Sequence, residues 1–223
     1  MADSITSVNI TAVFQGLFRI RDDESTTDFT LQASSGDRTY RIHKLVLLLH
    51  SQPLYRMATS PHFIECQNQT IIFQEVDDRC VQALVDFLYG QLLPHTEYIP
   101  ITAYSANLGT REEIKGCVAW FSGLWRLADM YDMPILAKSV VDGFEEHVEE
   151  ILMDLRRLEW ELDAVAEMEQ FPESLWEVLV DGCVDDFGEP GHQHRKEDTD
   201  RVFKKHPEFA LAVVQGMVGR NAV

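Results

Sequence analysis

Hydrophobic and polar residues alternate with a period of two in a segment near the N-terminus. Residues 28–33 (Asp-Phe-Thr-Leu-Gln-Ala) carry their three apolar side chains on one side, which is typical of a half-buried β-strand. The same period returns at Tyr40 and Ile42, after a Ser-Ser-Gly-Asp turn at 34–37. These positions predict a β-hairpin, and the run Thr-Ile-Ile-Phe at 70–73 predicts a third strand.

The spacing then changes to that of helices. Asp77 and Asp78 form a helix N-terminal signal, and a helix that ends at Tyr89 and Gly90 is predicted after them. Its apolar face has the spacing i, i+3, i+4, i+7 and consists of Val81, Leu84, Val85 and Leu88. Residues 91–110 have two prolines and no sustained period, so we predict a long loop there.

The C-terminal part of the chain is predicted to be helical. A helix that a heavily acidic face interrupts or extends is expected from Val140 to Leu158, and Pro172 and Pro207 are expected to begin two more. The apolar sides of these last two helices are formed by Leu175, Val178, Leu179 and Cys183, and by Phe209, Ala212, Val213, Gly216 and Met217.

In order and spacing, residues 28–75 resemble the BTB/POZ domain. The segment has a strand that begins Asp-Phe-Thr, a second strand that runs into His43-Lys44, a short loop with Phe63-Ile-Glu65, and a last strand before an acidic turn. The stretch 127–136 (Leu-Ala-Asp-Met-Tyr-Asp-Met-Pro-Ile-Leu) is similar to the last helical pair of the same family.

The resemblance implies a fold and a general function. The fold is α+β, a BTB/POZ fold with a small mixed sheet capped by helices over residues 11–140, followed by an all-helical extension over 141–223. The layout resembles stand-alone BTB proteins of fungal type. The family resemblance implies a non-enzymatic protein–protein interaction module with protein partners and no cofactor.

A partner-binding motif is implied at Phe63 and Glu65. BTB adaptors that bind a cullin scaffold carry a hydrophobic-x-Glu triplet in this loop, which Phe63-Ile-Glu65 matches. The aromatic ring would fill a pocket on the partner and the carboxylate would orient it. The alternative is that Phe63 packs on its own domain and Glu65 is solvated. Two function hypotheses follow: a cullin-type ubiquitin-ligase substrate adaptor, or a scaffold or transcription-linked oligomerisation module without a ligase role.

Self-association is expected through an N-terminal helix. Its apolar residues at helical spacing are Val13, Phe14, Leu17 and Phe18. The apolar side of a lone helix with two phenylalanines must be buried, either against its own domain or against a partner subunit. We favour the partner subunit, by analogy with the family.

A charged pair is also implied at the dimer interface. In dimeric BTB domains an aspartate at the first strand and a base after the histidine lie near a charged pocket, and Asp28 and Lys44 match these positions. The alternative is an ordinary surface pair that contributes less than about 1 kcal/mol.

The net charge of -18 narrows the choice of partners. Residues 138–190 carry 17 acids against 3 bases, which gives -14. An acidic body repels phosphate backbones and anionic lipid, so we expect neither nucleic acid nor membrane as a partner. The acidic segment is expected to be an exposed helical face, with a surface for a basic partner as the alternative.

The cysteines, the histidines and the short motifs of the sequence predict no disulfide, metal or catalytic site. The four cysteines are far apart and form no C-x-x-C pair, so neither a disulfide framework nor a zinc site is predicted, and a cytoplasmic or nuclear location is expected. His192 and His194 could chelate a metal, but a polar loop is the commoner explanation. No phosphate loop, H-E-x-x-H or G-x-S-x-G motif occurs, so we predict no catalytic residues.

Overall fold

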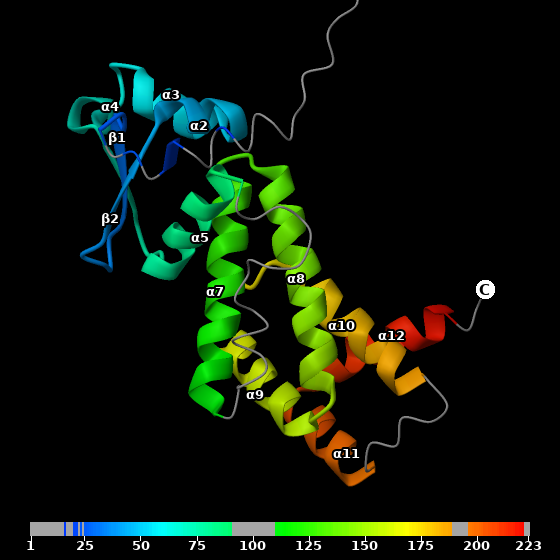
Figure 1. Cartoon of the computed structure of the whole chain (residues 1–223). Coiled ribbons are helices and arrows are strands. Elements are labelled where there is room, and N and C mark those ends of the chain that lie inside the picture. The colour runs from blue at the N-terminus through cyan, green and yellow to red at the C-terminus, as the bar shows by residue number, and fades with distance from the viewer. Residues whose placement is uncertain are drawn as a thin grey trace, which may run out of the picture. The chain divides into compact units, whose positions relative to one another are not determined.

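The computed structural model of the chain divides into two compact units, residues 1–98 with 130–133, and residues 99–129 with 134–223 (Figure 1). It describes residues 25–90, 110–188 and 196–220, together with Gly16, Ile20, Arg21 and Asp23. We describe each unit by itself. The division places the helix that begins at Arg111 with the later helices, and the expected domain boundary after residue 140 stays a prediction.

The first unit holds a three-stranded mixed sheet and four helices within its described residues. In chain order these are β1 (Phe29–Ala33), β2 (Thr39–Ile42), α2 (Lys44–His50), α3 (Gln52–Thr59), α4 (Ile64–Asn68), β3 (Thr70–Phe73) and α5 (Asp78–Leu88). The strand order is β2-β1-β3, with β1 antiparallel to β2 and parallel to β3. The predicted hairpin, third strand and amphipathic helix are confirmed, as is the α+β fold class.

Alternation along β1 decides which face of the sheet is covered. Phe29, Leu31 and Ala33 are buried, whereas the residues between them are partly exposed. In the register of the sheet Leu31 pairs with Ile71 and Ala33 with Phe73, and both β3 residues are also buried. One face of the sheet therefore forms the core of the unit, as expected for a half-buried strand.

Helix α5 packs on this sheet and holds the start of α2. Asp77 caps α5, because its carboxylate accepts a hydrogen bond from the Arg79 N–H at 2.7 Å. At the other end, the hydroxyl of the buried Tyr89 accepts a hydrogen bond from the His43 N–H at 3.0 Å and lies 2.6 Å from His43 Nδ1. His43 Nε2 lies 2.8 Å from the Thr26 hydroxyl, so both ring nitrogens of His43 have structural partners.

The second unit is helical in its described residues. It consists of α7 (Arg111–Met130), α8 (Pro134–Leu152), α9 (Leu155–Ala166), α10 (Glu173–Gly188), α11 (Lys196–Lys205) and α12 (Pro207–Arg220). The all-helical extension and the helix starts at Pro172 and Pro207 are thus confirmed within about one residue. None of the described helices is both long and apolar enough to span a membrane.

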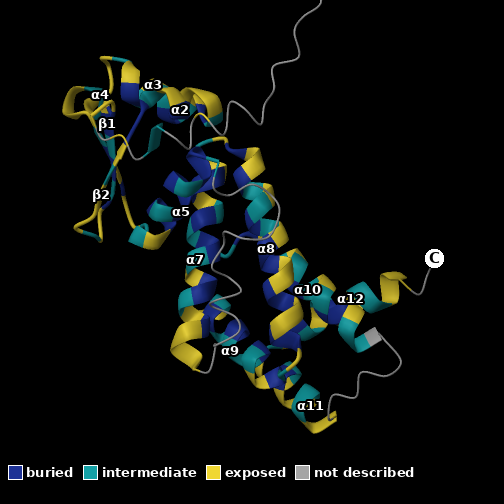
Figure 2. Cartoon of the chain, in the orientation of Figure 1, coloured by how far each residue is buried: buried dark blue, intermediate teal, exposed yellow. Residues whose placement is uncertain are grey.

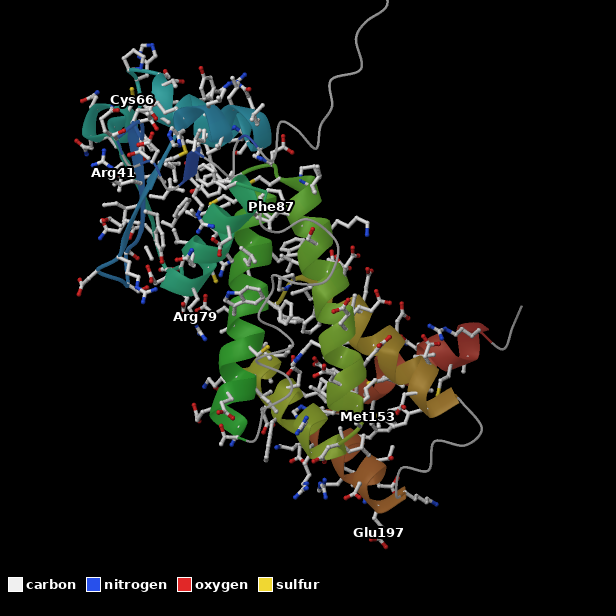
Figure 3. The ribbon with its side chains drawn as sticks, viewed as in Figure 1. Arg41, Cys66, Arg79, Phe87, Met153 and Glu197 are labelled. Carbon is white, nitrogen blue, oxygen red and sulfur yellow. The ribbon has the colours of Figure 1, made fainter. Side chains whose placement is uncertain are left out.

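The predicted helix over 140–158 is interrupted. Residues 140–158 do not form a single helix, because α8 ends at Leu152 and α9 begins at Leu155. Asp154 explains the break: it is in an extended conformation and its carboxylate accepts a hydrogen bond from the Arg156 N–H at 3.0 Å. The exposed Met153, labelled in Figure 3, marks this break.

Two glycines let α8, α10 and α12 approach closely. A Cβ atom on Gly182 of α10 would lie 2.7 Å from Val148 Cγ1 of α8, and one on Gly216 of α12 would lie 2.8 Å from Val184 Cγ2 of α10. Real Cβ contacts are longer than this. The two helix contacts therefore depend on the absence of side chains at these positions.

The expectation that the acidic segment is an exposed face is wrong for α9. Asp163 is only 10% exposed and forms ion pairs with Arg111 of α7 (2.9 Å) and Lys205 of α11 (2.7 Å). Glu159 pairs with Arg201 and Lys205 of α11 at 3.0 and 2.9 Å. The acids of α9 thus connect it to its neighbouring helices instead of lying in solvent.

A buried polar cluster connects three helices of the same unit. His147 of α8 and Glu161 of α9 are fully buried, and Nε2 of the ring lies 3.2 Å from the carboxylate. Cys117 Sγ of α7 lies 3.9 Å from Nδ1 of the same ring. Burial by itself lowers the pKa of His147, but the charge of Glu161 and the hydrogen bonds to both neighbours outweigh burial and raise the pKa to about 10.

We predict that His147→Leu lowers the free energy of unfolding by about 3–5 kcal/mol, because it leaves the Glu161 carboxylate buried without a partner. The double variant His147→Leu/Glu161→Leu should unfold within about 1 kcal/mol of wild type or be more stable. Urea denaturation measures both values. Glu149→Leu, at an exposed position of α8, is the control and should change stability by less than about 0.5 kcal/mol.

The stability conferred by this pair should also depend on pH. The pKa of His147 is about 10 in the folded protein against an ordinary value of 6.5, so its contribution is complete below pH 6.5 and declines as the pH rises toward 10. The difference in unfolding free energy between wild type and the double variant, measured across that range, isolates this effect from other titrating groups. A difference that is constant with pH would show that the pair is not charged.

Candidate protein-interaction surfaces

Helix α2 exposes three leucines. The helix buries Val46 and Leu47, whereas Leu45, Leu48 and Leu49 are 53%, 44% and 51% exposed. We call these three residues the leucine face. Single exposed leucines are ordinary, but three on a seven-residue helix form a local apolar surface.

The position of the leucine face follows from how α2 is held. Its inner side packs against α3 and α5, where Val46 and Leu47 are covered. The chain enters the helix from β2 through His43, whose backbone N–H is bound by Tyr89. Five consecutive residues of a helix span more than one full turn, so the aliphatic side chains over 45–49 cannot all face the core and some must be exposed. These three leucines were not predicted as a surface, although the aliphatic run is visible in the sequence.

Asp28 and Lys44 both lie at the start of α2 but do not pair through their side chains. The Asp28 carboxylate accepts a hydrogen bond from the Lys44 backbone N–H at 2.8 Å. The Lys44 ammonium instead donates to Gln69 Oε1 at 2.7 Å and lies 5.4 Å from the centre of the Phe29 ring. Asp28 therefore caps α2, and Lys44 connects the start of α2 with the residue that ends α4.

The N-terminal candidates for the dimer interface, Val13, Phe14, Leu17 and Phe18, lie outside the described residues. The same holds for His192, His194 and nearly all of the predicted 91–110 loop. Within the ranges that the structure describes, no group of three or more His, Cys, Asp or Glu side chains is placed to hold a metal ion.

Phe63, Ile64 and Glu65 lie at the start of α4 and form a second exposed surface, which we call the 63–65 patch. Phe63 precedes the helix in an extended conformation and is 42% exposed, and Ile64 is 58% exposed. Glu65 is partly buried in the first turn. Figure 3 labels Cys66, the next residue, on this short helix.

The patch combines apolar groups with a negative charge. Burial raises the pKa of Tyr131, and the charge of Glu65 raises it further, so the carboxylate lies close enough to act on that hydroxyl. Phe63 and Ile64 are partly covered by their own unit and partly exposed, so both interpretations of the triplet, a partner anchor and packing on its own domain, stay predictions. Ile64 was not nominated from the sequence, because the triplet motif leaves its middle position open.

The exposed large apolar residues described in the first unit are those of the leucine face, Phe63 and Ile64 of the 63–65 patch, Ile72 of β3 and Met130. Helices α2 and α4 both carry exposed stretches in Figure 2. Residues 17–108 match the family model described as the BTB/POZ domain. The match covers β1 to α5, and the helices from α7 onward lie beyond it. No curated protein matches the sequence.

Removal of the α2 cap should reduce stability. Asp28→Ala leaves the Lys44 N–H without its acceptor and is expected to lower the free energy of unfolding by about 1 kcal/mol. Asp28→Asn keeps an acceptor oxygen and should lose less. Asp37→Ala, in the exposed hairpin turn, is the control, and thermal or urea unfolding compares the three. Equal stability of Asp28→Ala and wild type would show that the cap does not hold the helix start.

Proposed function

Since the chain contains a BTB/POZ domain, which is a protein–protein interaction module, we propose that it self-associates through the leucine face of α2 and docks a second protein on the 63–65 patch. The observation that carries the proposal is the exposure of Leu45, Leu48 and Leu49 on one short helix of the BTB unit. In solution this surface favours association with another apolar surface.

The size of the leucine face supports a contribution to a dimer, not a whole interface. Covering the exposed half of three leucines would contribute about 2–4 kcal/mol on each subunit. A stable dimer requires more, since association itself costs several kcal/mol. We therefore propose that Val13, Phe14, Leu17 and Phe18 belong to the same interface, and that Asp28 contributes by fixing the start of α2.

For the second protein we propose a cullin scaffold, which would make the chain a ubiquitin-ligase substrate adaptor. The support is the order of the patch, with Phe63 and Ile64 exposed side by side and the Glu65 carboxylate next to them. Such an apolar anchor with a charged rim suits a pocket on a partner helix. The alternative is a scaffold or transcription-linked oligomerisation module without a ligase role, which would require the leucine face but not the patch.

A reducing compartment, cytoplasmic or nuclear, is part of the proposal. None of the four cysteines is in a disulfide, and Cys80, Cys117 and Cys183 are buried. Burial raises the pKa of the Cys80 thiol to about 12, which keeps it protonated and unreactive at neutral pH. Buried free cysteines of this kind are usual where disulfides do not form.

Self-association is tested by Leu48→Ser/Leu49→Ser. Wild type is expected to elute with twice the 25.6 kDa chain mass by light scattering, and the double variant with the mass of one chain. Ile72→Ser is the control, because Ile72 is 49% exposed on β3 of the same unit. Phe14→Asp/Leu17→Asp should act as the leucine variant does. A leucine variant that folds and remains a dimer would contradict the proposed interface.

Cullin docking is tested by Phe63→Ala/Glu65→Ala. Truncation of both residues is expected to weaken binding to a purified cullin N-terminal domain by about 100-fold or more, as loss of an interface anchor does. The matched control is Gln67→Ala, an exposed polar residue of the same helix α4. If wild type dimerises but does not bind the cullin, the scaffold alternative stands.

A further inference from the structure

Helix α11 has few apolar contacts with the rest of its unit, in which it lies against α9 and α12 (Figure 1). Val202 is the single buried residue of its ten, and the half-buried Phe203 meets the rings of Phe187 and Phe209 edge-on. By contrast, α9 buries five residues, and Phe209 and Val213 of α12 are fully buried. Local stability depends on such buried contacts, so apolar packing holds α11 more weakly than it holds these neighbours.

Three ion pairs join α11 to α9. Glu159 of α9 pairs with Arg201 at 3.0 Å and with Lys205 at 2.9 Å, and Lys205 also pairs with Asp163 at 2.7 Å. Both cations are exposed, whereas both acids are mostly covered. Ion pairs with an exposed partner are individually weak and are screened by salt, so α11 is held by several weak contacts that depend on charge.

Departure of α11 would leave no buried charge without a partner. Asp163 keeps its ion pair with Arg111 of α7 at 2.9 Å, and the Glu159 carboxylate, which is already partly exposed, becomes hydrated. The buried pair of His147 and Glu161, which joins α8 to α9, does not involve α11. An uncompensated buried charge is what makes the loss of an ion pair costly, so opening of α11 avoids that cost and leaves the contacts among α7, α8 and α9 in place.

The connection to α12 lets α11 move by itself. Helix α11 ends at Lys205 and α12 begins at Pro207, which has no N–H with which to continue the hydrogen bonds of α11. Helix α12 has its own buried residues, Phe209 and Val213, so its position does not depend on α11. The chain can therefore turn at His206 while α12 stays packed.

We propose that α11 is a conformational switch held closed by charge: it opens locally while the other helices of the unit stay folded, and the ion pairs of Arg201 and Lys205 set the fraction of open molecules. Opening makes Glu159 and the ring of Phe209 accessible, both of which α11 contacts in the closed state. Higher ionic strength weakens the ion pairs and shifts the population toward the open state. The switch requires neither the leucine face nor the 63–65 patch.

The test is hydrogen exchange of the full chain, measured by mass spectrometry on peptides from α11 and α12. At low salt the α11 amides of wild type should exchange faster than those of α12, because α11 opens without global unfolding. A rise in NaCl from about 20 mM to about 500 mM should speed exchange in α11 about threefold, relative to the unfolded chain, and leave α12 unchanged.

Substitutions at one position separate charge from packing. Lys205→Gln removes two ion pairs and should speed exchange in α11 about fivefold, with a smaller further effect of salt. Lys205→Arg keeps the charge and should stay within about twofold of wild type. Lys204→Gln is the matched control, because Lys204 is exposed in the same last turn and forms no ion pair within the described residues.

A substitution on the α9 side checks the same contacts from their other end. Glu159→Gln removes the pairs with Arg201 and Lys205 and should change exchange in α11 as Lys205→Gln does. Circular dichroism confirms that each variant is folded.

Three outcomes would overturn the proposal. Exchange in α11 that is as slow as in α12 at both salt concentrations would show that α11 does not open by itself. Acceleration of α11 and α12 together would show that the two helices open as one. Exchange in Lys205→Gln equal to that of wild type would show that packing, not charge, holds α11. None of these measurements depends on dimerisation or on cullin binding, so failure of the proposed function leaves the test intact.

Discussion

The hydrogen bond between the His43 N–H and the hydroxyl of Tyr89 lies at the point where β2 becomes α2. Burial raises the pKa of Tyr89, so the hydroxyl keeps its proton and lies beside the His43 ring. Asp28 binds the next backbone N–H, that of Lys44. These two contacts fix the first residue of α2 and hence its rotation. Because a shift of one residue turns a helix by about 100°, they determine that Val46 and Leu47 face the core while the leucine face lies outside.

Much of the fold could be predicted from local patterns. The strands β1 and β3 were predictable because one face of the sheet is buried, which imposes alternation on β1, and α5 was predictable because Asp77 caps it and its apolar spacing is regular. The position of the break between α8 and α9 was not predicted. Apolar residues continue on both sides of it, and Asp154 is one acid among many in that segment, so its role as a cap is visible only from the backbone.

The candidate surfaces were predictable only in part. Phe63 and Glu65 were found from the family resemblance, and the structure adds the exposure of Ile64 between them. The leucine face was not predicted, because a run of five aliphatic residues over 45–49 has no period that shows which of them the helix buries. The contact of His147 with Glu161 joins residues fourteen apart on different helices, and no helical or strand period predicts such a pair.

The acidic residues of the helical unit differ in their surroundings, which the net charge of the chain does not show. On α9 the acids Glu159 and Asp163 are covered and meet cations of α7 and α11, so they hold helices together. On α10, Asp181 and Asp185 both pair with Arg220 of α12. The acids of one segment therefore have two different roles: those of α9 and α10 pair with cations of neighbouring helices, whereas Glu145, Glu146, Glu149 and Glu150 of α8 are exposed.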